Sequence, residues 1–130
     1  MNYNYSITNK QPFFIIMRKI ETQMNMAIKS QKNWISGNTQ VITDNGFSRV
    51  FLHGNHIANV FDDVVNGDVK KVVQIFDGGW QTVTTKSRLN ALLDEFATGF
   101  SVFQKNWEWF VSDFQGKNIV DFDNGISISD

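Results

Sequence analysis

The sequence predicts an α+β fold in which two amphipathic helices pack on an antiparallel sheet of four to six strands, in the order α-β-β-β-β-α-β-β. Three observations predict it. Apolar residues recur at helical spacing in two separate segments, and they alternate with polar residues in the segments between and after these. Turn signals such as Asn-Gly and Gly-Gly separate the alternating segments. The chain has 130 residues, 42% of them hydrophobic, which suits one core but not two ordinary domains.

The first element is a helix that follows an N-terminal extension. Residues 1–16 are rich in Asn and Tyr and contain the only proline, so we expect an extension over 1–16 and a single α+β domain over 17–130. Met17 is an alternative start, because Met17-Arg18-Lys19 opens straight into the first periodic segment. Between Arg18 and Gln31 the apolar residues that recur at helical spacing are Ile20, Met24, Ala27 and Ile28.

Four strands follow, in an order that predicts an antiparallel meander. The predicted strands cover 39–43, 47–53, 56–61 and 70–76, joined by Asp44-Asn45-Gly46, by Gly54-Asn55 and by a loop over 62–68. In the second strand one face carries Ser48, Val50 and Leu52, and the other carries Phe47, Arg49 and Phe51.

The second helix and several short strands complete the chain. Its apolar stripe is Leu89, Leu92, Leu93 and Phe96. We expect this helix to begin at an N-cap Thr84 or Thr85 and to end before Gly99. Short strands are predicted over 100–105, 107–112, 118–122 and 126–128, the first two closed around Lys105-Asn106.

The strongest candidate site lies at the start of the second helix. Cations in a first helical turn oppose the helix dipole, so an anion is a physical reason to place them there. We predict an anion or nucleic-acid site formed by Thr84, Thr85, Lys86, Ser87 and Arg88. Trp80 and Arg49 are expected to make supporting contacts. The alternative is a threonine that caps the helix beside two solvated cations. The spacing of a P-loop is absent.

Two other motifs carry weaker signals. If Gly54-Asn55 is the turn, His53 and His56 face each other across two strands and could chelate zinc, but a surface pair is favoured because only Asp62 or Asp63 could supply a third ligand. Trp107 and Trp109 would share a strand face and could stack bases, although a role in the core is favoured. We therefore predict no metal site and no cofactor.

Composition excludes several classes of protein. The absence of Cys excludes disulfides, thiol nucleophiles and Cys-ligated metal sites, and a net charge of -1 excludes a highly basic nucleic-acid coat. The longest apolar run, Phe13–Met17, is too short for a membrane span or a signal peptide. Because the common catalytic motifs are missing as well, we expect a protein that is not an enzyme.

Two motifs carry a resemblance to a known group of proteins. Leu52-His53-Gly54-Asn55-His56-Ile57-Ala58 and the segment from Trp80 to Leu92, which contains Thr84-Thr85-Lys86-Ser87-Arg88-Leu89-Asn90, resemble small uncharacterised proteins of tailed bacteriophages. The resemblance extends from about Met17 to Phe110. It implies a viral origin and action in an infected bacterial cell, and it transfers no activity and no site residue.

We therefore expect a non-enzymatic bacteriophage accessory protein that binds a phosphate-bearing ligand, above all nucleic acid, in the cytoplasm of the infected host. Three alternatives stay open. The first is a module that inhibits or redirects a host protein, the second is a structural component of the virion, and the third is a sponge for a signalling nucleotide of host defence. No membrane partner is expected. Exposed edge strands leave a homo-oligomer open.

Overall fold

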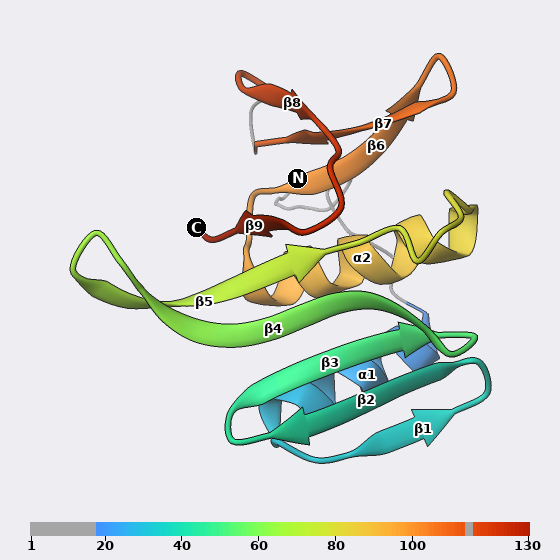
Figure 1. The fold of residues 1–130 in the computed structure, drawn as a ribbon, viewed down its shortest axis with the longest axis vertical. Helices are drawn as coiled ribbons and strands as arrows, with labels where there is room; N and C mark the ends of the chain where they lie inside the picture. The colour runs from blue at the N-terminus through green and yellow to red at the C-terminus, as the bar shows by residue number, and fades with distance from the viewer. Residues whose placement is uncertain (1–17, 114–115) are drawn as a thin grey trace, which may run out of the picture.

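Two antiparallel sheets and two helices form the fold (Figure 1), which confirms the predicted α+β class. The computed structural model describes residues 18–113 and 116–130, so the predicted extension over 1–16 lies outside the described residues. The larger sheet has six strands in the order β1-β2-β3-β4-β5-β9, and the smaller has the order β6-β7-β8.

The helices are α1 (Lys19–Lys29) and α2 (Val83–Phe96). The larger sheet consists of β1 (Trp34–Ser36), β2 (Thr39–Asp44), β3 (Phe47–Leu52), β4 (Asn55–Val65), β5 (Asp68–Ile75) and β9 (Ile126–Ile128). The smaller sheet consists of β6 (Ser101–Lys105), β7 (Glu108–Ser112) and β8 (Ile119–Asp121). No helix among the described residues is long and apolar enough to cross a membrane.

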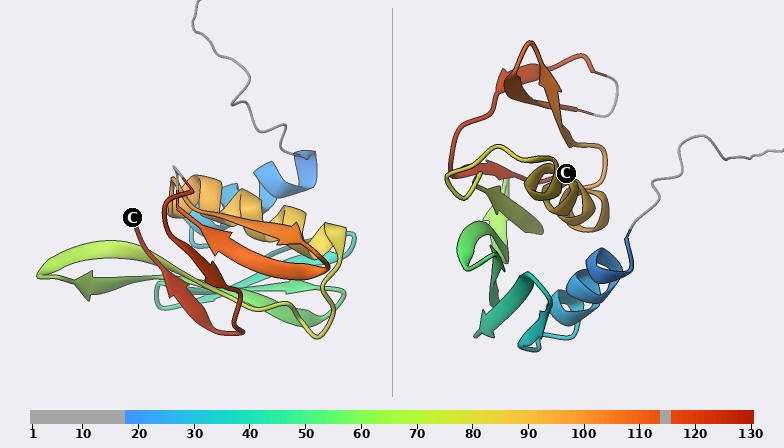
Figure 2. Two further views of the ribbon diagram at one scale, coloured as in Figure 1. Left: turned by 90° about the horizontal axis from the view of Figure 1, so that it is seen from above. Right: turned by 90° about the vertical axis from the view of Figure 1, so that its right-hand side faces the viewer.

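Both helices cover the same face of the six-stranded sheet, and the opposite face carries no helix among the described residues (Figure 2). The predicted stripe of α2 is buried, as are Met24, Ala27 and Ile28 of α1, and these residues pack on the inner residues of the sheet such as Val50 and Val73. The predicted alternation in β3 is confirmed, because Ser48, Val50 and Leu52 are buried while their neighbours are half-buried.

The smaller sheet is attached to α2. The Asn90 side chain donates to the Val102 carbonyl oxygen at 2.9 Å and accepts from the Val102 amide at 2.7 Å. Trp109 is 4% exposed and meets Phe122 edge to face, with ring centroids 5.3 Å apart. The last strand, β9, returns to the larger sheet and pairs with β5.

The turn between β3 and β4 lies one residue earlier than predicted. Leu52 pairs with Asn55, so His53 and Gly54 form the turn, with φ values of 52° and 77°. Two left-handed residues in succession are the conformation that twists with the strands in a type I′ hairpin. The two histidines therefore do not face each other, and Phe51 is the residue opposite His56.

Two other predicted boundaries shift as well, because each turn again consists of two residues with positive φ values. The segment predicted as a loop over 62–68 is a hairpin, since β4 continues to Val65 and the turn is Asn66-Gly67. Lys105 pairs with Glu108, which places Trp107 in the turn between β6 and β7. Trp107 has a φ of 68° and is 90% exposed. Trp107 and Trp109 consequently do not share a strand face.

Candidate functional site

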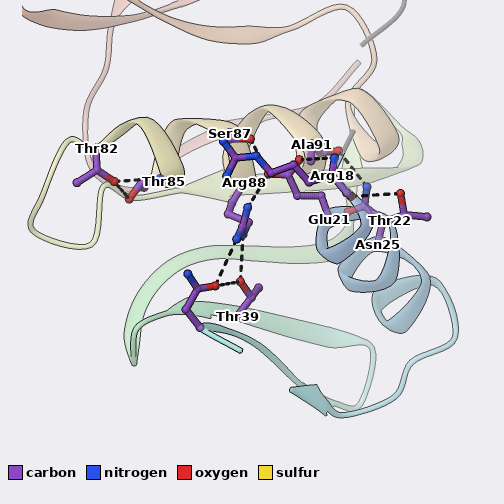
Figure 3. A network of polar contacts seen from close by, with 11 residues as sticks. Arg18, Glu21, Thr22, Asn25, Thr39, Thr82, Thr85, Ser87, Arg88 and Ala91 are labelled. Atoms are coloured by element: carbon purple, nitrogen blue, oxygen red, sulfur yellow. Dashed lines mark hydrogen bonds and ion pairs between the residues drawn. The ribbon is translucent and has the colours of Figure 1, made fainter. Parts of the chain in front are cut away.

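The predicted site residues lie in three places: the interior, the start of α2 with its pocket, and the helix-free face of the larger sheet. Arg88 lies in the interior. Arg88 is 3% exposed, and its Nη1 lies 2.8 Å from Glu21 Oε2 in an ion pair between α2 and α1 (Figure 3). Nε donates to Thr39 Oγ1 at 3.0 Å, and Nη2 donates to Asn38 Oδ1 at 3.3 Å. The guanidinium therefore ties both helices to the start of β2.

Ser87 belongs to the same interior cluster, because its hydroxyl donates to Glu21 Oε2 at 2.6 Å. Glu21 was not among the predicted site residues, yet a signal for its burial exists in the sequence. It lies three and seven residues before the apolar Met24 and Ile28, on one helical face with them, just as Arg88 lies beside Leu89 and Leu92. Opposite charges inside two apolar stripes indicate a buried pair.

The threonines at the start of α2 serve mainly as a cap. The N-cap is Thr82 rather than Thr84 or Thr85, because Thr82 Oγ1 accepts from the Thr85 amide at 3.1 Å. The hydroxyls of Thr82 and Thr85 lie 2.9 Å apart, and Thr85 is buried. Lys86 follows on the helix, half-buried, and makes no ion pair with any described residue.

A pocket of about 220 Å³ lies between this helix start and the turn that joins β3 to β4. Its lining includes Trp80, which is 72% exposed, together with Thr84, His53, Asn55 and Asp77. The first amides of a helix have no acceptor within the helix, so the N–H groups of Val83 and Thr84 are not used by α2 itself.

One glycine allows the loop before α2 to approach β4 closely. Gly78 has a φ of 71°, and a Cβ atom there would lie 3.1 Å from Ile57 Cγ2 and 3.3 Å from Asn55 Cβ. Any other residue would be strained at this φ and would push the loop outward. Gly78 thus keeps the loop that carries Trp80 against the end of the sheet.

Arg49 lies on the helix-free face of the larger sheet, apart from the helix start. We call this surface the open face and define it by the residues Phe47, Arg49, Phe51, His56, Asn59, Phe61, Gln74 and Phe76. Arg49 pairs with Ile42 and Asn59 in the strand register, and its guanidinium makes no ion pair with a described residue. It is the cation at the centre of this surface.

Aromatic rings lie on both sides of Arg49. On one side the His56 ring lies 5.4 Å from Phe51 and 4.8 Å from Phe76, measured between centroids, which makes a row of three rings from β3, β4 and the residue that follows β5. On the other side Phe47 and Phe61 stack at 5.0 Å. All five rings are half-buried, so each keeps part of its surface toward solvent.

Polar side chains between the two groups of rings are held in place. His56 Nε2 lies 2.6 Å from Asn59 Oδ1, and Asn59 Nδ2 donates to Gln74 Oε1 at 2.9 Å. A change of register between Val50 and Phe51 makes this possible, because it turns both Ile57 and Ala58 inward and leaves His56 and Asn59 on one face.

The row of three rings and the pocket occur at the same end of the sheet. Asn55 lines the pocket and is followed directly by His56, and Asp77 lines the pocket directly after Phe76. Because successive strand residues point to opposite faces, the pocket lies toward the helix-covered side of this end of the sheet and the ring row toward the open face. Of the predicted residues, the structure places Trp80 and Thr84 at the pocket and Arg49 on the open face, and it ties Ser87 and Arg88 to Glu21 between the two helices.

Among the described residues no group of three or more His, Asp or Glu side chains is placed to hold a metal ion. In comparisons with known proteins, residues 17–129 match the family model described as Kyanoviridae Gp96 protein. This match confirms the predicted resemblance to small bacteriophage proteins. No curated protein and no solved structure matches the chain.

Proposed function

The chain belongs to the Kyanoviridae Gp96 protein family, a family of bacteriophage proteins, and from this premise we propose that it binds single-stranded nucleic acid in the infected cell without acting as an enzyme. The observation that carries the proposal is the open face, on which Arg49 lies between two groups of half-exposed aromatic rings that no helix of the described residues covers. This combination suits a ligand with both π-faces and phosphates.

Stacking is the first contribution to the proposed binding. Each base has a π-face, and a base stacked on an aromatic side chain contributes about 1–3 kcal/mol whatever its sequence. Phe51 and Phe76, at the two ends of the ring row, and the exposed Trp80 beyond it offer such surfaces. Paired bases in a duplex cannot reach these rings, so the proposal favours single strands.

Charge is the second contribution, and it is small. Arg49 has no carboxylate partner among the described residues, so its guanidinium is available to a phosphate. The first amides of α2, which have no acceptor within the helix, and the nearby Lys86 supply a second positive position. With two or three phosphate contacts, the logarithm of affinity should fall with the logarithm of salt concentration at a slope of about −2.

The proposal keeps Trp80, Thr84, Lys86 and Arg49 from the predicted site and assigns Ser87 and Arg88 to the interior instead. Thr85 acts through the cap. The open-face residues Phe51, His56 and Phe76 join the site, and Asn59 and Gln74 hold the His56 side chain in place through a chain of hydrogen bonds.

Fluorescence polarisation with labelled DNA and RNA, single- and double-stranded, tests the proposal across about 50 to about 300 mM salt. We expect single strands to bind best. Arg49→Ala should weaken binding about tenfold at low salt and make the salt slope shallower by about 0.7. Lys117→Ala, which removes an exposed cation outside the site, is the matched control and should change neither quantity.

A second candidate is docking of a host protein on the same open face, which the Phe47–Phe61 stack favours. Aromatic residues and Arg are enriched where protein partners bind. No binding of any nucleic acid at low salt would reject the first proposal and leave this candidate. Binding that persists unchanged in Arg49→Ala would reject the assigned surface.

A further inference from the structure

We propose that His56 makes the open face selective for bases with an exocyclic amino group, because its Nδ1 atom is held as a hydrogen-bond acceptor. The inference rests on the proposed binding of single-stranded nucleic acid and adds a preference among bases. His56 lies in the middle of the ring row, between Phe51 and Phe76. In a neutral imidazole one ring nitrogen donates and the other accepts, so the position of the proton decides what the ring can recognise.

A chain of hydrogen bonds that starts from a backbone carbonyl sets the orientation of the neighbouring amides. The Gly125 carbonyl oxygen can only accept, and it accepts from Gln74 Nε2 at 3.2 Å. Gln74 Oε1 therefore faces Asn59 and accepts from Asn59 Nδ2 at 2.9 Å. The other amide atom of Asn59, the oxygen Oδ1, lies 2.6 Å from His56 Nε2. The imidazole thus faces an oxygen and not an amide N–H group.

His56 Nε2 must therefore carry the ring proton. Besides Asn59 Oδ1, the Ala58 carbonyl oxygen lies 3.0 Å from Nε2, so two oxygens that can only accept face this atom. Without a proton, Nε2 would direct its lone pair at both oxygens. A proton on Nε2 leaves Nδ1 of the neutral ring as an acceptor.

This acceptor is open to a ligand. Among the described residues His56 Nδ1 takes part in no hydrogen bond, and it is not a buried polar atom that lacks a partner, so it keeps contact with solvent. Phe51 and Phe76 flank the imidazole on its two sides, with centroids 5.4 and 4.8 Å away, so a ligand reaches the ring at its edge. A base stacked on either Phe is close enough to bring its own edge to Nδ1.

An acceptor at this place favours an N–H donor on the base. Adenine and cytosine present such a donor in their exocyclic amino groups, whereas thymine presents an oxygen at the corresponding position. Phe51 and Phe76 stack any base, so they contribute affinity without choosing among bases. The preference for an amino group therefore comes from His56.

Fluorescence polarisation tests the preference at low salt and at pH about 8, where free imidazole is neutral. The two probes are a strand of deoxyadenylate and a strand of equal length with purine in place of adenine, which keeps the stacking rings and lacks only the amino group. The wild type should bind the adenine strand about fivefold more tightly. His56→Phe keeps an aromatic ring, so it should bind both strands equally and bind the purine strand within about twofold of the wild type.

Long-range proton–nitrogen NMR spectra of the wild type give a readout that does not depend on the folding of His56→Phe. They should show a proton on His56 Nε2 and none on Nδ1, and the Nδ1 resonance should shift with the adenine strand but not with the purine strand. A proton on Nδ1 of the free protein would overturn the inference. A preference for adenine that persists in His56→Phe would overturn it as well.

The same titrations distinguish failure of this inference from failure of the proposed function. Equal binding of the two strands by the wild type would reject the selectivity and leave the binding of single strands intact. No binding of either strand would reject both. Lys117→Ala, which lies outside the site, is the control and should keep the full preference for the adenine strand.

Discussion

At the scale of single residues, the buried pair of Arg88 and Glu21 decides what the surface can offer. A cation beside a helix start looks like an anion ligand in the sequence, but its partner lies 67 positions away and becomes visible only once α1 packs against α2. Because Glu21 also accepts from Ser87 and from the Arg18 amide, the carboxylate has three kinds of donor. This pair contributes to the structure of the core rather than to ligand binding.

Removal of one partner should therefore be costly. Arg88→Met leaves Glu21 as a buried charge without its cation and should lower the free energy of unfolding by about 3–5 kcal/mol. Lys86→Met, at the half-buried neighbouring cation, should change it by no more than about 0.5 kcal/mol. Urea denaturation measures both. The double variant Glu21→Leu/Arg88→Met should recover much of the loss, and equal effects of the two single variants would contradict the assignment.

Asp94 near the end of α2 provides a dependence of stability on pH. Partial burial, and then the neighbouring Glu95, raise the pKa of the Asp94 carboxyl above its ordinary value of 3.8. A carboxyl whose pKa is higher in the folded state favours unfolding when ionised, so Asp94 lowers stability at neutral pH, and this penalty vanishes as pH falls through the folded pKa to below 3.8.

Asp94→Asn should accordingly raise the urea midpoint at pH about 7 and leave it nearly unchanged at pH about 3. Paired denaturation curves of the two proteins at each pH measure this difference. A stabilisation that is the same at both pH values would show that the change acts through something other than ionisation.

At the scale of elements, local patterns predicted the helices and most strands, and they failed where a turn required an unusual backbone. The stripe of Leu89, Leu92 and Leu93 and the alternation around Val50 are strong because packing enforces them. The turns at His53 and Trp107 lie one residue away from the predicted positions. Both residues adopt positive φ values, which are uncommon for residues other than glycine and which the sequence does not indicate at these positions. The three-residue β1 is too short for a periodic signal.

The N-cap of α2 allows a direct test at this scale. Thr82→Ala removes the oxygen that accepts from the Thr85 amide and should lower the free energy of unfolding by about 1 kcal/mol. Thr84→Ala, at the position predicted from the sequence, should cost clearly less because its side chain caps nothing among the described residues. Chemical denaturation measures the free energy of unfolding of both variants. A larger loss of stability in Thr84→Ala than in Thr82→Ala would contradict the assignment of Thr82 as the cap.

At the scale of the whole molecule, the placement of both helices on one side of the larger sheet defines the candidate site (Figure 2). The sequence predicted that Phe47, Arg49 and Phe51 share a face, but not that neither described helix covers this face. Nor could it bring Phe76 and Trp80 to the same end as His56, because that requires the register of β3, β4 and β5 together. Sites built across strands depend on such nonlocal pairing.

The exposed Trp80 gives the most direct test of nucleic-acid binding at the end of the sheet. The affinity of a labelled single-stranded oligonucleotide is compared for the wild type, Trp80→Ala, Trp80→Phe and Trp107→Ala. The account predicts that Trp80→Ala weakens binding about 5- to 150-fold, which corresponds to the loss of one stacked base, and that Trp80→Phe retains most of the affinity. Trp107→Ala, at an exposed ring in the turn between β6 and β7, should change nothing. Equal affinities for Trp80→Ala and the wild type would contradict the account.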